Sequence, residues 1–407
     1  MASHPPGPLP RSAPTLVSGL RASSSETANR IIFDAEDVIH RLEPEATPLI
    51  TLTAGIKKRR MATQQRFDWF EVDPYPSELV VSGAQTAGDT SIEVQTGTGS
   101  RAAGSFVYVN RKTREVIRVT SVATDTLTVV RGYGGYSAAM SDGDVLELIG
   151  TAFEDGTGFG TMKSVQSANL YSYTQIFRTQ YGLTGRMQNT DLYGGNDLTN
   201  QRKDQGILHK KLIEKAFFFG KRNLVAGSTG PITTTQGLEA SISSNVWDLN
   251  GQEPNQRSVV EFLEYVMKYG KGGNIGGSGA ATKYAFCSRR WLTVIESFAH
   301  DQVRWEYIGD KQTGVGINVG RFVTSHGSLM LTPVNIFDGE HGGYMFIVDL
   351  NHVRYVYHQG RHTKLMQDRQ ANDLDGYQEE YLTDCGLEVS LEAAHGLAKG
   401  LPVTYAA

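Results

Sequence analysis

Cysteine, proline and long apolar runs are all scarce in this chain of 407 residues, and each scarcity excludes a class of protein. Its two cysteines, Cys287 and Cys385, lie outside any Cys-x-x-Cys pattern, which excludes a framework of several disulfides and a cysteine zinc site. No stretch reaches the roughly 18 consecutive apolar residues of a membrane-spanning helix, so we expect no membrane partner. The 39 Lys and Arg residues nearly balance the 43 Asp and Glu residues, which predicts only weak, non-specific contact with nucleic acid.

Recognisable catalytic patterns are also missing. The glycine-rich segment 270–279 is not followed by the Lys-Ser/Thr of a phosphate-binding loop, and the chain has no Gly-x-Ser-x-Gly or His-Glu-x-x-His motif. His358 and His362 have a spacing that a metal could use, but no carboxylate nearby completes a familiar ligand set. We therefore expect no catalytic residue, no metal and no cofactor.

What the chain does have is glycine, 45 residues against 13 prolines, which favours many tight turns. Between residues 77 and 150, short β-branched runs alternate with glycine turns at a spacing of about ten residues, a pattern typical of a small antiparallel barrel or sandwich. Alternation is clearest at Ile92/Val94 and Leu127/Val129. The predicted strands are 78–81, 91–95, 106–110, 115–119, 126–131 and 145–149.

Two aromatic segments flank this region. Residues 66–72 (RFDWFEV) alternate aromatic and charged side chains, which indicates a half-buried strand, and residues 170–180 (LYSYTQIFRTQ) have the same texture. The segment 1–28, rich in proline and serine, cannot bury enough apolar surface to order itself. We expect the barrel region to interrupt a long hairpin, and the first segment to act as an arm that orders only against a partner.

Helices are expected farther along the chain. Residues 200–223 carry the clearest helical pattern, with Leu208 and Leu212 on one face and Ile213 beside it. Ser258 and Glu261 have the spacing of a capping box at the start of a second helix. A third helix is expected after Ser288. Most of the chain beyond it favours strands, at 327–333, 344–350, 353–358, 377–382 and 387–391.

This order of elements resembles the major capsid proteins of tailed bacteriophages with the Hong Kong 97-type fold, and in particular their SU-ten-like branch. The most specific likeness lies in residues 173–178 (YTQIFR) with the small-residue run 182–185 (GLTG), and in residues 209–214 (HKKLIE) leading to 218–220 (FFG). The barrel segments 110–119 and 127–132 resemble modules inserted in such proteins. The resemblance covers about residues 30–400.

The resemblance implies an α+β fold with an N-terminal arm, an extended hairpin called the E-loop, a spine helix, and peripheral and axial domains, here with a small all-β barrel inserted in the E-loop. The implied parts are the arm at 1–60, the E-loop at 61–76 and 151–195, the barrel at 77–150, the spine helix with part of the peripheral domain at 196–256, the mainly axial domain at 257–350, and the returning peripheral strands at 351–407.

The function implied is structural. Many copies would self-assemble, as hexamers and pentamers, into an icosahedral shell around packaged double-stranded DNA, in a virion assembled in the bacterial cytoplasm. Because a two-stranded hairpin is only marginally stable alone, we expect its aromatic side chains to pack on neighbouring subunits. The candidate contacts are Arg59, Arg60, Phe67, Trp69, Phe70, Tyr173 and Phe177. A flexible loop near the capsomer axis is expected at Gly270, Gly273, Gly276 and Gly279.

The chain lacks a long charged helical segment at its N-terminus, which implies a separate scaffolding protein; a portal and a decoration protein are further expected partners. Three other functions stay open: a cellular nanocompartment shell of the same fold, a phage tail or decoration protein that binds through the barrel, and an enzyme. A cargo enzyme that co-purifies with the particle would favour the nanocompartment. A rod or a free oligomer in micrographs, in place of a closed shell, would favour the tail or decoration protein, and the missing motifs count against an enzyme.

Overall fold

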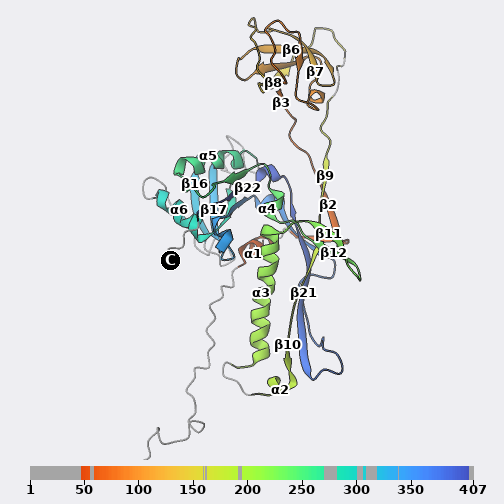
Figure 1. Cartoon of the computed structure of the whole chain (residues 1–407), viewed down its shortest axis with the longest axis vertical. Helices are drawn as coiled ribbons and strands as arrows, with labels where there is room; N and C mark the ends of the chain where they lie inside the picture. Colours follow the sequence, from red (N-terminus) through yellow and green to blue (C-terminus); the bar gives the residue numbers. More distant parts are fainter. Residues whose placement is uncertain are drawn as a thin grey trace, which may run out of the picture. The chain divides into compact units, whose positions relative to one another are not determined.

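The computed structural model describes residues 47–55, 59–158, 160, 163–190, 195–269, 282–299, 306–308, 319–337 and 339–402 (Figure 1). It comprises two compact units. The smaller contains Thr179–Leu208 and Leu365–Tyr381, and the larger contains Ala46–Arg178, His209–Lys364 and Leu382–Ala407. The expected glycine loop, with Gly270, Gly273, Gly276 and Gly279, lies outside the described residues, and so do residues 1–46 and 56–58 of the expected arm.

Six short strands between residues 78 and 151 form one antiparallel sheet in the order β3-β8-β5-β6-β7-β4. They are β3 (Glu78–Val80), β4 (Ser91–Glu93), β5 (Phe106–Asn110), β6 (Val116–Ala123), β7 (Thr126–Val130) and β8 (Val145–Thr151). A bridge between Val81 and Val94 joins the first strand to the last, so the sheet closes into a barrel. Each strand lies close to its position predicted from the alternating pattern.

The barrel interior is filled by the residues that alternate along these strands. Ile92, Val94, Leu127 and Val129 are all buried in it, together with Tyr108. A barrel of six strands has little space inside, so side chains fill it completely and leave the neighbouring positions to solvent.

A buried ion pair fixes the turn that follows β7. The Arg131 guanidinium donates to both carboxylate oxygens of Glu115 at 2.8 Å, and neither side chain is more than 6% exposed. Arg131 also donates to backbone oxygens of Thr86 and Ala138, while Glu115 accepts from the N–H of Gly132. Burial by itself raises the pKa of Glu115, but the hydrogen bonds from Arg131 and the backbone outweigh it and leave that pKa below its ordinary value.

The largest sheet has seven strands in the order β13-β22-β18-β14-β17-β16-β15. They are β13 (Val246–Asp248), β14 (Thr282–Cys287), β15 (Glu306–Ile308), β16 (Val319–Thr324), β17 (Gly327–Pro333), β18 (Met345–Val348) and β22 (Gly396–Lys399). The helices α5 (Gln256–Met267) and α6 (Arg289–Ala299) pack against it, with Leu263 and Trp291 fully buried in the shared core (Figure 1).

The start of α5 differs from the prediction. Asn255 is the N-cap, and its side chain accepts from the N–H of Ser258 while the Ser258 hydroxyl accepts from the N–H of Asn255. Ser258 is therefore the third helical residue and not the cap. Asparagine and serine both cap helices well, so the local pattern fits either register. The predicted cap of α6 is confirmed, since the N–H of Trp291 donates to the Ser288 hydroxyl at 3.4 Å.

A second sheet has the order β1-β19-β21-β10, with β20 paired to β21. Its strands are β1 (Arg59–Ala62), β10 (Gln175–Thr184), β19 (Val353–His358), β20 (Lys364–Met366) and β21 (Gly376–Val389). The two strands predicted at 377–382 and 387–391 are thus one long strand. Further elements are α1 (Pro48–Gly55), α2 (Gly185–Gln188), α3 (Asp197–Phe219) and α4 (Leu238–Ser241), and the hairpin strands β2 (Arg66–Glu71), β9 (Ala168–Tyr173), β11 (Asn223–Ala226) and β12 (Pro231–Thr234).

Candidate interaction surfaces

The paired strands β2 and β9 present one face to the core of the larger unit. Phe67 is 3% exposed and packs with Ala62 and Val356, and Trp69 packs against the same cluster. Gly386 of β21 permits this close approach, because a Cβ there would lie 2.8 Å from the Tyr173 carbonyl oxygen and 2.9 Å from the Phe67 ring. The inward face of the hairpin is therefore part of the core of its own chain.

Two predicted contact residues are corrected by this packing. Phe67 is buried against Val356, and Phe177, 8% exposed, lies in the main core cluster with Phe217 and Tyr355. Their burial within one chain removes both from the candidate contacts. An alternating pattern shows that a strand is half buried but does not say whether its buried face meets the same chain or another.

The two predicted arginines differ in their surroundings. Arg60 donates to the Glu388 carboxylate at 2.6 Å and to the Asp68 carbonyl oxygen at 2.9 Å, so it joins β1, β21 and the hairpin. The Arg59 side chain is exposed on β1. Arg59 therefore stays a candidate contact, while Arg60 has a structural role already.

The outward face of the hairpin carries an arrangement that the sequence did not reveal. The Tyr171 ring lies between two guanidinium groups, those of Arg66 and Arg222, each 4.1 Å from its centroid. Tyr173 meets Tyr171 edge to face at 5.7 Å, and Phe70, two residues from Asp68 along β2, is 71% exposed. We call these five residues, Arg66, Phe70, Tyr171, Tyr173 and Arg222, the arginine–aromatic face.

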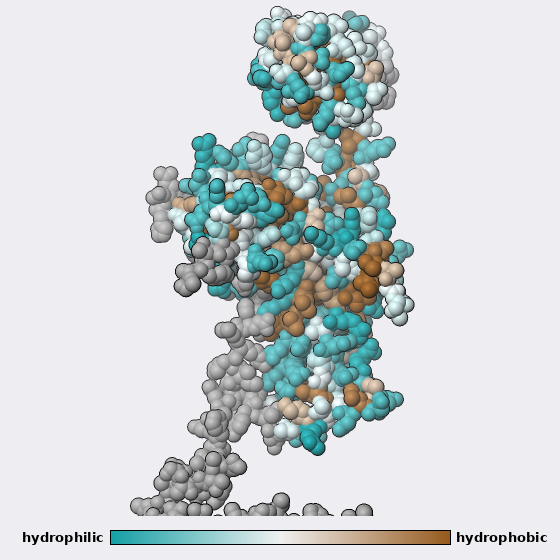
Figure 2. All heavy atoms as spheres, in the orientation of Figure 1, coloured by the Kyte–Doolittle hydropathy of each residue, from teal (hydrophilic) through white to brown (hydrophobic). Residues whose placement is uncertain are grey.

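The hairpin β11–β12 continues this face. Arg222 immediately precedes β11 and donates to the Tyr171 carbonyl oxygen, while the Thr233 hydroxyl of β12 donates to the carbonyl oxygen of Thr174. The three large apolar side chains of β11–β12 are at least 47% exposed, and apolar surface gathers over this hairpin in Figure 2. They are Leu224, Val225 and Ile232.

The long helix α3 begins three residues before the predicted start and ends four before the predicted end. Its buried side chains include His209, Ile213 and Phe217, whereas Leu208 and Leu212 are about two-fifths exposed at 39% and 43%. The apolar pattern predicted the helix but did not decide which of its two adjacent faces is covered. Leu208 and Leu212 are thus further exposed apolar positions.

On the buried side of α3, Glu214 meets the start of α1. Its Oε1 accepts from the N–H of Leu49 at 3.1 Å, at the end of the helix where N–H groups lack partners inside it. Its Oε2 has no hydrogen-bond partner among the described residues. Burial raises the pKa of Glu214 to about 8.

This raised pKa predicts a pH-dependent stability. Because the pKa of Glu214 is higher in the folded than in the unfolded chain, the folded chain binds more protons between pH 4.5 and 8. As the pH rises through that window, Glu214 therefore lowers the free energy of unfolding by at most about 1.4 kcal/mol per pH unit. Glu214→Gln should remove this part of the slope in urea unfolding measured from pH 5 to pH 8. The exposed Glu264→Gln is the matched control and should leave the slope as it is; equal slopes in all three proteins would contradict the prediction.

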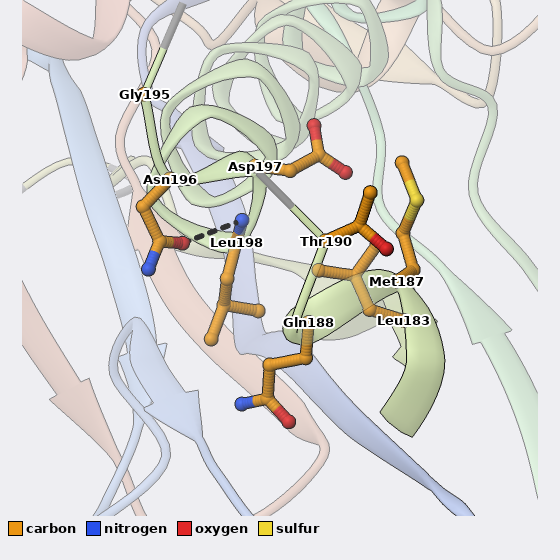
Figure 3. Close-up of a pocket in the computed structure, with 8 residues that line it drawn as sticks. All are labelled: Leu183, Met187, Gln188, Thr190, Gly195, Asn196, Asp197 and Leu198. Atoms are coloured by element: carbon orange, nitrogen blue, oxygen red, sulfur yellow. Dashed lines mark hydrogen bonds between the residues drawn. The ribbon is translucent and has the colours of Figure 1, made fainter. Parts of the chain in front are cut away.

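A hollow of about 290 Å³ lies in the smaller unit between α2 and the start of α3 (Figure 3). Its lining includes Leu183, Met187 and Asp197, and the Asn196 side chain accepts from the N–H of Leu198 at 3.0 Å. Among the described residues that line it, Asp197 is the one ionisable group. Those described residues do not include the paired groups that acid–base or nucleophilic chemistry uses.

The described histidines do not form part of a metal site either. His362 lies against the rings of Tyr355 and Tyr357, and burial lowers its pKa, while His358 has its Nδ1 3.2 Å from the Gln359 carbonyl oxygen. Across the described ranges, no group of three His, Cys, Asp or Glu side chains could hold a metal ion. In the same ranges no helix is both long and apolar enough to span a membrane.

The chain is similar in sequence to a known protein family. A model of the SU10 major capsid protein family matches residues 21–402. The chain belongs to this family. The major capsid protein of Pseudomonas phage PaMx41 is 24% identical over 345 residues, which cover 81% of this chain and 79% of that protein.

Solved structures similar to this capsid protein include the capsid of an empty GTA particle, with a TM-score of 0.49 and 9% identity over 94% of this chain and 100% of that one. The capsid of cyanophage A-1(L) has a TM-score of 0.49 and 10% identity, over 92% of this chain and 98% of that one. The SrpI encapsulin of Synechococcus elongatus has a TM-score of 0.43 and 11% identity, over 60% of this chain and 80% of that one. The assignment rests on the sequence match to the family.

As a phage major capsid protein, the chain is a component of the virion, where many copies form the head shell that encloses the genome. The prediction of a tailed-phage major capsid protein is confirmed. The mixed α and β architecture agrees with the Hong Kong 97-type fold that the resemblance implies.

Proposed function

We propose that this capsid protein closes into an icosahedral shell of hexamers and pentamers, and that its hairpin β2–β9 is the base of an E-loop into which the six-stranded barrel is inserted. The family match over residues 21–402 carries the shell function. The strand order supports the second part: β2 pairs with β9 from Arg66↔Tyr173 to Glu71↔Ala168, and all six barrel strands lie between them in the sequence.

The remaining domain boundaries follow from the same reasoning. The spine helix is α3, the axial domain is centred on the seven-stranded sheet with α5 and α6, and the peripheral domain is built on the sheet of β10, β19 and β21. The role is structural and not enzymatic, which the lining of the hollow beside α3 supports. Assembly takes place in the host cytoplasm with a separate scaffolding protein, a portal and a decoration protein, and contact with packaged DNA is weak because the net charge is −4.

Exposed apolar surface in a single chain supports assembly through protein contacts. Phe70, Leu224, Val225 and Ile232 are between 47% and 71% exposed, and burying such side chains is the main favourable term in obligate association. The small hairpin β11–β12 needs such packing, because two isolated strands are only marginally stable.

The test is to express the chain alone and together with the other head proteins of its phage, and to examine the products by electron microscopy and sedimentation. Closed shells of uniform diameter are expected, with a higher yield when a scaffolding protein is present. Rods or small rings would favour a tail or decoration role. Shells that enclose a host enzyme in place of DNA would favour a nanocompartment.

A further inference from the structure

The side chains of the arginine–aromatic face are held in position by contacts within a single chain. Tyr171 is held between Arg66 and Arg222, and Arg222 is held in turn by its hydrogen bond to the Tyr171 carbonyl oxygen. Arg66 is fixed by Asp68 at 2.8 Å. Side chains that are already immobilised lose little entropy on binding, and tyrosine and arginine are enriched among the residues that dominate binding energy.

Charge on this face is not balanced. Arg66 has Asp68 as its partner, but no carboxylate among the described residues lies within ion-pair distance of Arg222 or of its neighbour Lys221, and both side chains are exposed. Beside them are the exposed apolar side chains of β11–β12. A ligand that fits this surface must combine acidic groups with an apolar side chain.

The chain itself exposes a segment of that chemistry. In residues 370–377, Asp373 and Asp375 flank Leu374, which is 47% exposed, and the segment contains no Lys or Arg. Its shape is fixed by two turn hydrogen bonds at 3.0 Å, from the N–H of Leu374 to Ala371 and from the N–H of Gly376 to Leu374. We call residues 371–376 the acidic turn.

We propose that the arginine–aromatic face, with Lys221 and the β11–β12 hairpin, binds the acidic turn of a second copy of this chain. The contact would place Asp373 or Asp375 against Arg222 and Leu374 against Leu224 and Ile232. This proposal rests on the proposed shell function, since it names one of the contacts by which copies join. The positive face sets the orientation and the apolar side chains supply most of the affinity.

Charge reversal tests the contact. Arg222→Glu, and separately Asp373→Lys with Asp375→Lys, should each raise the concentration needed for particle formation by at least tenfold in sedimentation, while the protein carrying all three changes should return to within threefold of the wild type. Arg257→Glu is the matched control, because Arg257 is 87% exposed on α5 and pairs with Glu261. It should assemble as the wild type does. Circular dichroism and thermal unfolding establish that each variant is folded.

Crosslinking gives a readout that does not depend on reversing Arg222. Both native cysteines are buried, so cysteines placed by Lys221→Cys and Asp373→Cys can be addressed selectively. Particles assembled from a mixture of the two variants should give a covalent dimer with a short bismaleimide, and particles of either variant alone should not.

The outcomes separate the two proposals. If the wild type forms particles, but the charge variants assemble equally well and the mixed particles give no dimer, this contact is wrong and the shell function stands. Loss of assembly that the triple change does not restore, without a crosslink, also overturns the contact. A wild-type chain that stays monomeric under all conditions overturns both.

Discussion

Arg131→Met is expected to lower the free energy of unfolding of the barrel by about 3–5 kcal/mol, because it leaves the Glu115 carboxylate buried without its counter-charge. Glu115 is fully buried, and the loss of Arg131 also frees the carbonyl oxygens of Thr86 and Ala138. Hydrogen exchange of β5 to β8 in the full chain measures the effect. Exchange should accelerate throughout the barrel strands and stay unchanged in the seven-stranded sheet.

A surface pair of the same chemistry provides the control. Arg111 contacts Glu78 at 2.6 Å, but both side chains are about half exposed, at 51% and 53%. Arg111→Met should therefore cost far less stability than Arg131→Met, because solvent screens an exposed ion pair. Equal effects of the two substitutions would show that burial of the Arg131–Glu115 pair is not what holds the barrel together.

Lys283→Met is expected to destabilise the larger unit by about 3 kcal/mol, because three buried or partly buried carbonyl oxygens lose their donor. The Lys283 ammonium group donates at 2.6 Å to Val266 and Tyr269, at the end of α5, and to Ala394 just before β22. Burial lowers the pKa of Lys283 to about 8, so the group still carries its proton at pH 7. One side chain thus joins β14, the end of α5 and the segment before β22.

Thermal and urea unfolding at pH 7 check this expectation. The control is Lys399→Met, because Lys399 is partly exposed and lies 3.6 Å from Asp248 in a surface pair. Its loss should cost less than about 1 kcal/mol. If Lys283→Met is as stable as Lys399→Met, the three carbonyl oxygens have found other donors and the expectation is wrong.

Much of the secondary structure could be predicted because its signals are local. The barrel strands follow from alternating β-branched residues between glycine turns, and the helix α3 follows from its apolar spacing. The strand β17 has the predicted bounds, Gly327–Pro333. One strand was predicted as two, at 377–382 and 387–391. In the structure the strand β21 continues through Gly386, where the absence of a side chain makes room for Phe67 and Tyr173.

Contacts between segments that are distant in the sequence could not be predicted from any local sequence pattern. The sandwich of Arg66, Tyr171 and Arg222 joins three segments. Tyr171 belongs to an aromatic segment that was expected to contact neighbouring subunits, but neither Arg66 nor Arg222 was among the predicted contact residues. Glu115 and Arg131 are 16 residues apart in the sequence, and Lys283 reaches Ala394 across 111 residues. Which distant side chains form such pairs depends on how the strands and helices pack together. The spacing of residues along the chain does not predict these pairs.

The amino-acid sequence by itself determined the order of strands and helices, the barrel between two aromatic strands, and the likeness to phage capsid proteins that the family match confirms. Only the tertiary structure decided which aromatic side chains are free to meet another copy. Phe67 and Phe177 are buried in their own chain and Phe70 is exposed, although all three lie in similar alternating segments. The physical reason is that periodicity specifies the two faces of a strand, whereas burial depends on which surface packs against each face.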